Sequence, residues 1–339
     1  MCIFRRQEGY TLIIVLWSII ILTIIFLYLL DDVLINNYLL KGYADYITMR
    51  QAALSGYNIG VNLLLNDKSI YDTEKDPSFQ PIHGSIDGVE YLVLIKDAGS
   101  RPNVNYDDIN ILKELEGWND ELETYLENNF IPDLLFIKDC LPEEDYPLFR
   151  ASVTTYGNLN LNHDSPGKLK KLFEQLELGH FYSETLCESL KEYREEKKII
   201  SIDELPFEIE GLDLTVFEKI REYLTIEGRM NINFVDPDVL KSIIRVKGFD
   251  SRIADRILSY RKENEIKDIE ELEGIMHGEE YAEIADLFTT NSRYIELNVL
   301  AQVSDKSAYE IYSVLERSYQ DKRWIIKVLS WNESEIYME

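Results

Sequence analysis

The chain has 339 residues, with 35 lysines and arginines against 62 aspartates and glutamates, which gives a net charge of −27. Its length allows about two or three domains and is enough to bury real cores. The negative charge disfavours nucleic acid and anionic lipid as partners, because both attract positively charged proteins.

Residues 12–30, "LIIVLWSIIILTIIFLYLL", contain no charge, proline or glycine. At about 1.5 Å per residue this run reaches roughly 28 Å, close to the ~30 Å hydrocarbon core of a bilayer. Two arginines precede the run and two aspartates follow it, so the positive-inside rule predicts a cytoplasmic N-terminus with everything after Asp31 carried across. A cleaved secretory signal fits less well, because the run is longer than usual and no small-residue cleavage site follows.

The residues just before this run, "RRQEGYTL", form a basic leader that ends in Gly9 and is followed by Tyr10. This pattern resembles the type III signal of type IV pilins and type II secretion pseudopilins. The resemblance implies that a prepilin peptidase cuts between Gly9 and Tyr10 on the cytoplasmic side and that Tyr10 is then N-methylated. Residues 1–9 would be the leader, and residues 10–30 would stay as a transmembrane helix. A plain signal anchor is the alternative.

Most members of that class carry glutamate at the fifth mature position, whereas this chain has Ile14 there. A carboxylate inside a bilayer is expensive and is kept only where a cation faces it. In the family, the cation is the terminal amine of the subunit assembled just before. A first subunit needs no such carboxylate, so Ile14 points to the tip of a pilus, the place of the general secretion pathway protein K family. Random loss in a non-assembling anchor is the alternative.

Helical spacing of apolar residues continues from residue 31 to residue 65 without proline, although Gly42, Gly56 and Gly60 weaken the pattern locally. Residues 88–99 alternate and predict a strand; so do 293–304, 308–319 and 323–332, whose short connections predict an antiparallel meander. A lone strand needs partners, so we pair the early strand with the late ones. The predicted fold class is α+β, with a discontinuous pilin-like domain over 31–98 and 293–339 and a helical insertion over 99–292.

The insertion repeats one short pattern three times: two asparagines one residue apart, then a helix N-cap residue, then Leu-Lys. The caps are Asp108, Ser165 and Asp236. Asparagine amides at such positions satisfy backbone groups of a turn, so we interpret the pairs as architecture. The asparagines are Asn103, Asn105, Asn160, Asn162, Asn231 and Asn233.

Residues 156–225 and 227–290 repeat over a longer stretch, and each predicts a small bundle of short helices. These units resemble helix-hairpin-helix or SAM-like modules, which the protein K family carries in its insertion. DNA-binding versions offer a glycine-rich turn to a phosphate. Here Gly248 is present, but Asp250 stands where the second glycine would be, and its charge repels phosphate. No nucleic acid is therefore expected.

Catalytic and metal-binding signals are weak. There is no nucleophile elbow, phosphate loop or HExxH motif, so we assign no catalytic residue and predict no enzyme. Acidic clusters, such as Asp97 with Asp107 and Asp108, could hold calcium, but none has the spacing of a recognised loop and no metal ligand is assigned. Cys140 and Cys187 could pair outside the cell or remain free thiols.

Together these features predict a minor pseudopilin that initiates or caps the pseudopilus of a type II secretion system or a type IV pilus. The expected partners are the prepilin peptidase, other minor pseudopilins through the N-terminal helix, the membrane and an exported substrate. The protein would be a single-pass inner-membrane protein with its bulk periplasmic or extracellular. Two alternatives stay open: a membrane-anchored DNA-uptake receptor and a signal-anchored adhesin.

Overall fold

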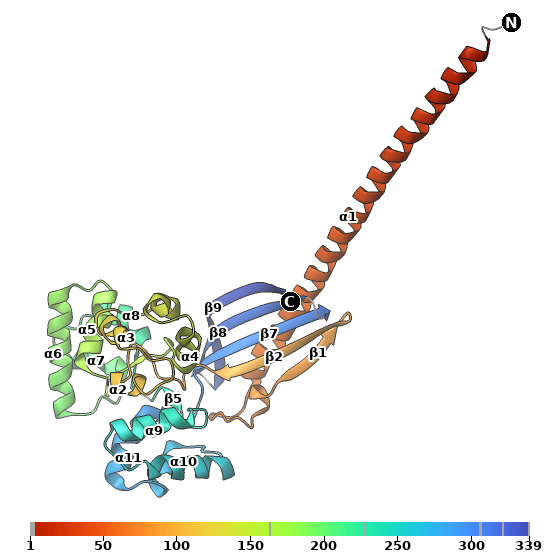
Figure 1. Cartoon of the computed structure of the whole chain (residues 1–339). Helices are drawn as coiled ribbons and strands as arrows, with labels where there is room; N and C mark the ends of the chain where they lie inside the picture. Colours follow the sequence, from red (N-terminus) through yellow and green to blue (C-terminus); the bar gives the residue numbers. More distant parts are fainter. Residues whose placement is uncertain (1–3, 163, 227, 305–306, 321, 338–339) are drawn as a thin grey trace.

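The computed structural model describes residues 4–162, 164–226, 228–304, 307–320 and 322–337. One long helix leads into a five-stranded antiparallel sheet, and a group of short helices lies on the side of that sheet away from the helix N-terminus (Figure 1). The chain is an α+β protein, and the predicted fold class is confirmed.

Helix α1 runs from Phe4 to Asn66, a continuous 63 residues. Its first part projects away from the rest of the molecule, and its last part lies on the sheet (Figure 1). The apolar residues of the projecting part form no buried core, whereas Met49, Ala52, Ala53 and Leu64 are buried against strands. One helix therefore has two different surroundings along its length.

Two of the glycines in α1 have a packing reason. A Cβ added to Gly56 would lie 2.9 Å from both Tyr91 Cδ2 and Val299 Cγ1, and one added to Gly60 would lie 2.6 Å from Leu297 Cδ1. The missing side chains let the helix approach the sheet closely. Gly42 has nothing within 4 Å of its Cβ position. Glycines that weaken helix propensity in the sequence thus form the contact face of the helix.

The sheet has the strand order β1-β2-β7-β8-β9, with every neighbouring pair antiparallel. Its strands are β1 (Ile82–Ile86), β2 (Val89–Asp97), β7 (Tyr294–Ser304), β8 (Ser307–Gln320) and β9 (Arg323–Tyr337). The early strand pairs with the late ones, as β2 pairs with β7 over eight residue positions from Glu90 to Asp97. Alternate residues of β2 are buried against α1, which explains the alternation in its sequence.

Strand β1 was not predicted from the sequence. It is joined to β2 by Asp87 and Gly88, both with positive φ (51° and 82°), as in a two-residue hairpin turn. The Asp-Gly dipeptide is a strong hairpin signal, but "IHGSI" is short and poor in strand-forming residues, so its alternation was not recognised. A short 3₁₀ turn, η1 (Pro77–Phe79), precedes it.

The helical part consists of three units, each closed by a short parallel pairing between its first asparagine and a threonine. The first unit, residues 103–154, is closed by a bridge between Asn103 and Thr154. The second, residues 160–225, is closed by β3 (Leu159–Asn160) and β4 (Leu224–Thr225). The third, residues 231–289, is closed by β5 (Met230–Asn231) and β6 (Phe288–Thr289). The first asparagine pair therefore opens a unit of the same kind as the other two.

Each unit has its own apolar core. The first contains α2 (Ile109–Leu112), α3 (Asp120–Asn128), η2 (Leu134–Cys140) and α4 (Asp145–Ser152). The second contains α5 (Pro166–Gln175), α6 (His180–Glu196), η3 (Ile202–Glu204), α7 (Leu205–Glu208), α8 (Leu214–Ile220) and η4 (Arg221–Tyr223). The third contains α9 (Pro237–Val246), α10 (Arg252–Glu263), η5 (Ile269–Gly274), α11 (Gly278–Ile284) and η6 (Ala285–Leu287).

Candidate functional site

The projecting part of α1 is the largest exposed apolar surface among the described residues. Every large apolar side chain from Tyr10 to Tyr43 is exposed, and none of its most apolar stretch is buried against the rest of the molecule. The hydroxyl groups of Ser18 and Thr23 donate to the carbonyls four residues earlier, at 2.8 Å each. Polar groups in lipid must be satisfied within the segment in this way. The helix is long and apolar enough to span a membrane.

The residues predicted for processing lie in the first turns of this helix. Gly9 is part of the α1 backbone, and Tyr10 and Ile14 are exposed on its surface, 70% and 64% respectively. No acidic or basic side chain occurs between Tyr10 and Leu30. Cleavage at Gly9, methylation of Tyr10 and a tip position marked by Ile14 stay predictions.

The far half of α1 is held on the sheet by an ionic clamp as well as by its apolar face. Arg50 donates to Glu333 of β9 through Nε (2.7 Å) and Nη2 (3.1 Å), and the Tyr309 hydroxyl donates to the same carboxylate. The hydrogen bonds from Arg50, and to a smaller extent the one from Tyr309, lower the pKa of Glu333 to about 2. Tyr57 packs edge-on against Trp331, with ring centroids 4.6 Å apart. The clamp fixes β9 to the helix where the helix leaves the body.

A buried joint connects the end of α1, the sheet and the third unit. The Asp72 carboxylate accepts from Arg317 of β8 and from the backbone N–H of Ser292 (2.6 Å). The Asp72 carbonyl accepts from the amides of Asn231 and Asn233, each at 3.1 Å. Arg317 is fully buried, with its guanidinium 4.1 Å from the Trp324 ring centroid. This joint positions the helical units relative to α1.

The three asparagine pairs make the same hydrogen bonds in all three units. The first asparagine accepts from the backbone N–H of the second through its side-chain oxygen, at 2.8, 2.9 and 3.0 Å. The second asparagine binds the N–H and the carbonyl of one distant isoleucine. These isoleucines are Ile131, Ile199 and Ile266. Each second asparagine thus links two loops of its own unit, which is an architectural role.

The helices that follow the asparagine pairs begin directly after the residues predicted as N-caps. The Asp108 and Asp236 carboxylates accept from backbone N–H groups of α2 and α9. Ser165 occupies the N-cap position of α5 but its hydroxyl makes no capping hydrogen bond.

A buried arginine joins all three units. Arg229, just before the third unit, donates to Asp107 of the first (2.5 Å) and to Asp164 of the second (2.6 Å). Each aspartate also accepts from the N–H of its unit's first asparagine, Asp107 through its other oxygen (2.5 Å) and Asp164 through the oxygen that binds Arg229 (2.7 Å). Sequence reasoning missed Arg229 because its two partners lie 122 and 65 residues away.

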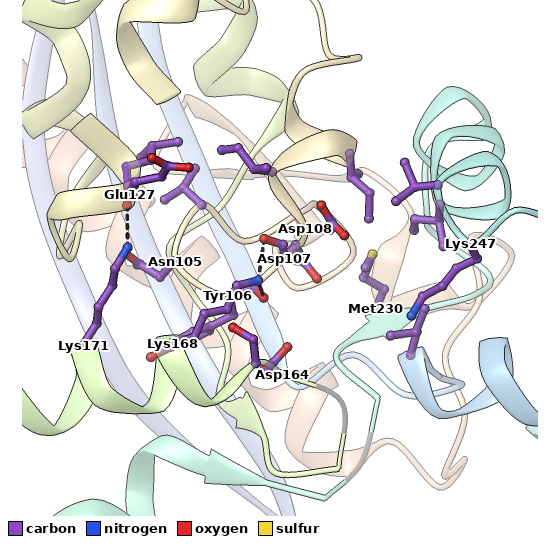
Figure 2. A pocket seen from close by; sticks show the side chains of 18 residues that line it. Asn105, Tyr106, Asp107, Asp108, Glu127, Asp164, Lys168, Lys171, Met230 and Lys247 are labelled. Atoms are coloured by element: carbon purple, nitrogen blue, oxygen red, sulfur yellow. Dashed lines mark hydrogen bonds between the residues drawn. The ribbon is translucent and has the colours of Figure 1, made fainter. Parts of the chain in front are cut away.

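A cavity of about 350 Å³ lies beside this arginine, between the units. Asp107, Asp164, Lys168 and Lys171 from the first two units and Met230 beside the third line this cavity (Figure 2). Lys168 donates to the carbonyls of Tyr106 and Asp107, and Lys171 to the carbonyl of Leu126 (2.9 Å). The lysines thus bind backbone of the neighbouring unit.

The acidic side chains that were candidates for calcium binding do not form a calcium site. Asp107 is paired with Arg229, Asp108 caps α2, and Asp97 accepts from the N–H of Ser100 at 2.5 Å. Within the described ranges, no group of three or more His, Cys, Asp or Glu side chains could hold a metal ion. Cys140 and Cys187 are both free thiols, so of the two alternatives the structure shows the unpaired one.

The turn between α9 and α10 has a carboxylate where a phosphate would bind in a DNA-binding module. Gly248 has a positive φ of 79°, and Asp250 accepts from the backbone N–H of Arg252 at 2.9 Å and from its guanidinium. The hydrogen bonds from Arg252 lower the pKa of Asp250 to about 2, so it is charged at neutral pH. The turn's own acid therefore occupies the N–H of Arg252.

Comparison with known proteins gave a likeness of fold. No protein-family model and no curated protein matches the chain. Among solved structures, it is similar to a chain of "The Crystal Structure of the GspK-GspI-GspJ complex from enterotoxigenic Escherichia coli Type 2 Secretion System". The two share 12% identity with a TM-score of 0.41, over 87% of this chain and 98% of that one. A likeness at this level carries no argument for function, which must come from the residues themselves.

Proposed function

We propose that the chain is a membrane-anchored minor pseudopilin or minor pilin that assembles through α1 with other membrane-anchored chains. The observation that carries the proposal is the division of α1. Its apolar first half is wholly uncovered, while its second half forms the core of the α+β body. Such a helix is an anchor and a packing surface at one end and a rigid support at the other.

The assembly step follows from the chemistry of the uncovered half. Residues 10–30 reach roughly 32 Å as a helix, enough for the hydrocarbon core. Cleavage after Gly9 would remove the basic leader and leave the apolar helix in place. Helices in lipid associate by van der Waals packing, and the large side chains from Ile13 to Leu30 offer that surface. In this proposal the N-terminus is cytoplasmic and the body lies on the outer side of the inner membrane.

A position at the tip is supported by two features. Ile14 leaves the span without a carboxylate, so the helix needs no cation from a preceding subunit. The three helical units lie on the side of the sheet away from the membrane end of α1 (Figure 1). Their bulk would leave little room for a further subunit above, and would face an exported protein first.

Processing and assembly are tested with Gly9→Val and Ile14→Glu in cells that carry the assembly machinery. Gly9→Val should prevent cleavage and abolish fibre formation or secretion, because the peptidase must bring its catalytic groups to this peptide bond. Ile14→Glu should reduce initiation, since an unpaired carboxylate in the bilayer costs about 2.5–3.5 kcal/mol. Ile13→Leu is the matched control and should behave as the wild type. Normal fibres from the Gly9→Val chain would refute the proposal.

A further inference from the structure

Strand β9 leaves one edge of the sheet open. Among the described residues, β9 pairs with β8 on one side only, because it is the last strand in the order. The first half of β9 lies beside the second unit, where Lys327 Nζ is 3.4 Å from Glu222 Oε2. Residue Leu329 is bulged, and from Ser330 to Tyr337 the ladder with β8 is unbroken. Figure 1 shows β9 at the outer edge of the sheet, close to the point where α1 leaves the body.

Residues 328–337 of β9, the open half, have a bulge at Leu329 and two glutamates but lack the other usual protection of an edge strand. Proteins commonly guard exposed edges with lysine, proline or very short strands. Residues 328–337 contain no lysine, arginine or proline, and the strand is 15 residues long. Instead, this region exposes the apolar side chains of Val328, Leu329 and Trp331, at 49%, 38% and 40%. Unpaired backbone groups beside exposed apolar residues are the surface to which an extended peptide adds as a further strand.

The charge of residues 328–337 determines which kind of strand fits beside β9. Residues 328–337 carry Glu333, which is paired with Arg50 of α1, and Glu335, and the chain as a whole has a net charge of −27. A second copy pairing through this half would bring like charges together, which is unfavourable in neighbouring strands. A strand that carries lysine or arginine would place an opposite charge beside Glu335.

We propose that β9, from Val328 to Tyr337, is a docking edge for an extended segment of another protein. That segment would carry lysine or arginine and apolar residues on the same face, because Val328, Trp331 and Glu335 pair with Leu315, Ser313 and Tyr309 on one face of β8. It would add to the sheet by backbone hydrogen bonds, with its apolar side chains on Val328 and Trp331 and its basic ones near Glu335. The inference goes beyond the proposed function and does not depend on how the leader is processed.

The test uses the full-length chain in detergent and a labelled basic peptide, KTVTVTKT, which carries its lysines and valines on one face, with ETVTVTET as its acidic counterpart. Fluorescence anisotropy should show about tenfold tighter binding of the basic peptide, because one peptide is attracted to the acidic edge and the other is repelled by it. Val328→Lys and Glu335→Lys should each weaken binding about fivefold or more by adding a like charge at the edge. Phe207→Lys, which replaces another exposed apolar residue in the second unit, should leave binding unchanged.

Hydrogen exchange distinguishes strand addition from general attraction to an acidic protein. Bound peptide should protect the backbone amides of residues 328–337 and leave the exchange of the helical units unchanged. Equal weakening by Phe207→Lys, or protection spread over the helical units, would overturn the proposal. So would a concentration-dependent dimer that Val328→Lys abolishes, since the occupant would then be a second copy.

Discussion

Single side chains hold the helical units together by binding backbone groups far along the chain. Asn233 is buried and binds both the N–H (3.2 Å) and the carbonyl (2.9 Å) of Ile266. A buried backbone group that loses its partner keeps the full cost of its desolvation. The sequence indicated that the asparagines are architectural, because they recur at a fixed spacing. It could not indicate the isoleucine partners, because the loop between them differs in length in each unit.

Asn233→Ala should lower the free energy of unfolding by about 2–3 kcal/mol, because two buried backbone groups lose their partners. Urea denaturation of the protein in detergent measures this. Asn66→Ala is the control, because its exposed amide only donates to the carbonyl four residues earlier. An Asn233→Ala chain as stable as the control would contradict the assigned role.

Glu333 should make the attachment of β9 to α1 dependent on pH. Its pKa is about 2 in the folded chain and 4.5 as an ordinary glutamate. A carboxylate whose pKa is lower in the folded chain than in the unfolded chain contributes its full stabilisation of the fold above pH 4.5. That contribution is lost as the pH falls toward 2. The wild type should therefore be more stable than Glu333→Gln at pH 7, and the difference should shrink between pH 4.5 and pH 2. Thermal melts across this range give the comparison; a difference that grows on acidification would argue against the clamp.

At the scale of elements, α1 and four strands of the sheet could be predicted from their periodicity. The apolar run, the helical spacing after it and the alternation in β2, β7, β8 and β9 each specify one type of structure. The contact role of Gly56 and Gly60 could not be predicted, because a glycine in a helix lowers propensity whether it faces solvent or a strand. Only the sheet on the other side distinguishes these glycines from Gly42.

Substitutions of Gly56 and Gly42 should therefore change the stability of the protein in opposite directions. Gly56→Val would overpack the contact with Tyr91 and Val299 and should cost about 1–3 kcal/mol. Gly42→Ala, in the open, should add up to about 1 kcal/mol of helix stability. Circular dichroism melts of the two variants in the same detergent give both values. A stabilising Gly56→Val would mean that α1 does not approach the sheet as closely as described.

At the scale of the whole molecule, the three units act as one body because Arg229 pairs with one aspartate from each of the first two. Removing a buried partner of this kind leaves unpaired charge and costs about 3–5 kcal/mol. Arg229→Met should therefore separate the units, and limited proteolysis should cut the linkers at residues 155–159 and 226–230 faster. Adding Asp107→Asn and Asp164→Asn to the Arg229→Met chain removes the unpaired charges and should recover part of the resistance to proteolysis. Unchanged cleavage in Arg229→Met would show that the units are held by other contacts.

The proposed function depends on the fate of the first ten residues, and mass spectrometry of the mature N-terminus tests this most directly. The chain isolated from cell membranes should begin at Tyr10, carry one methyl group on its amine and remain in the membrane fraction. A mature chain that still begins at Met1, or one found free of the membrane without residues 10–30, would contradict the account.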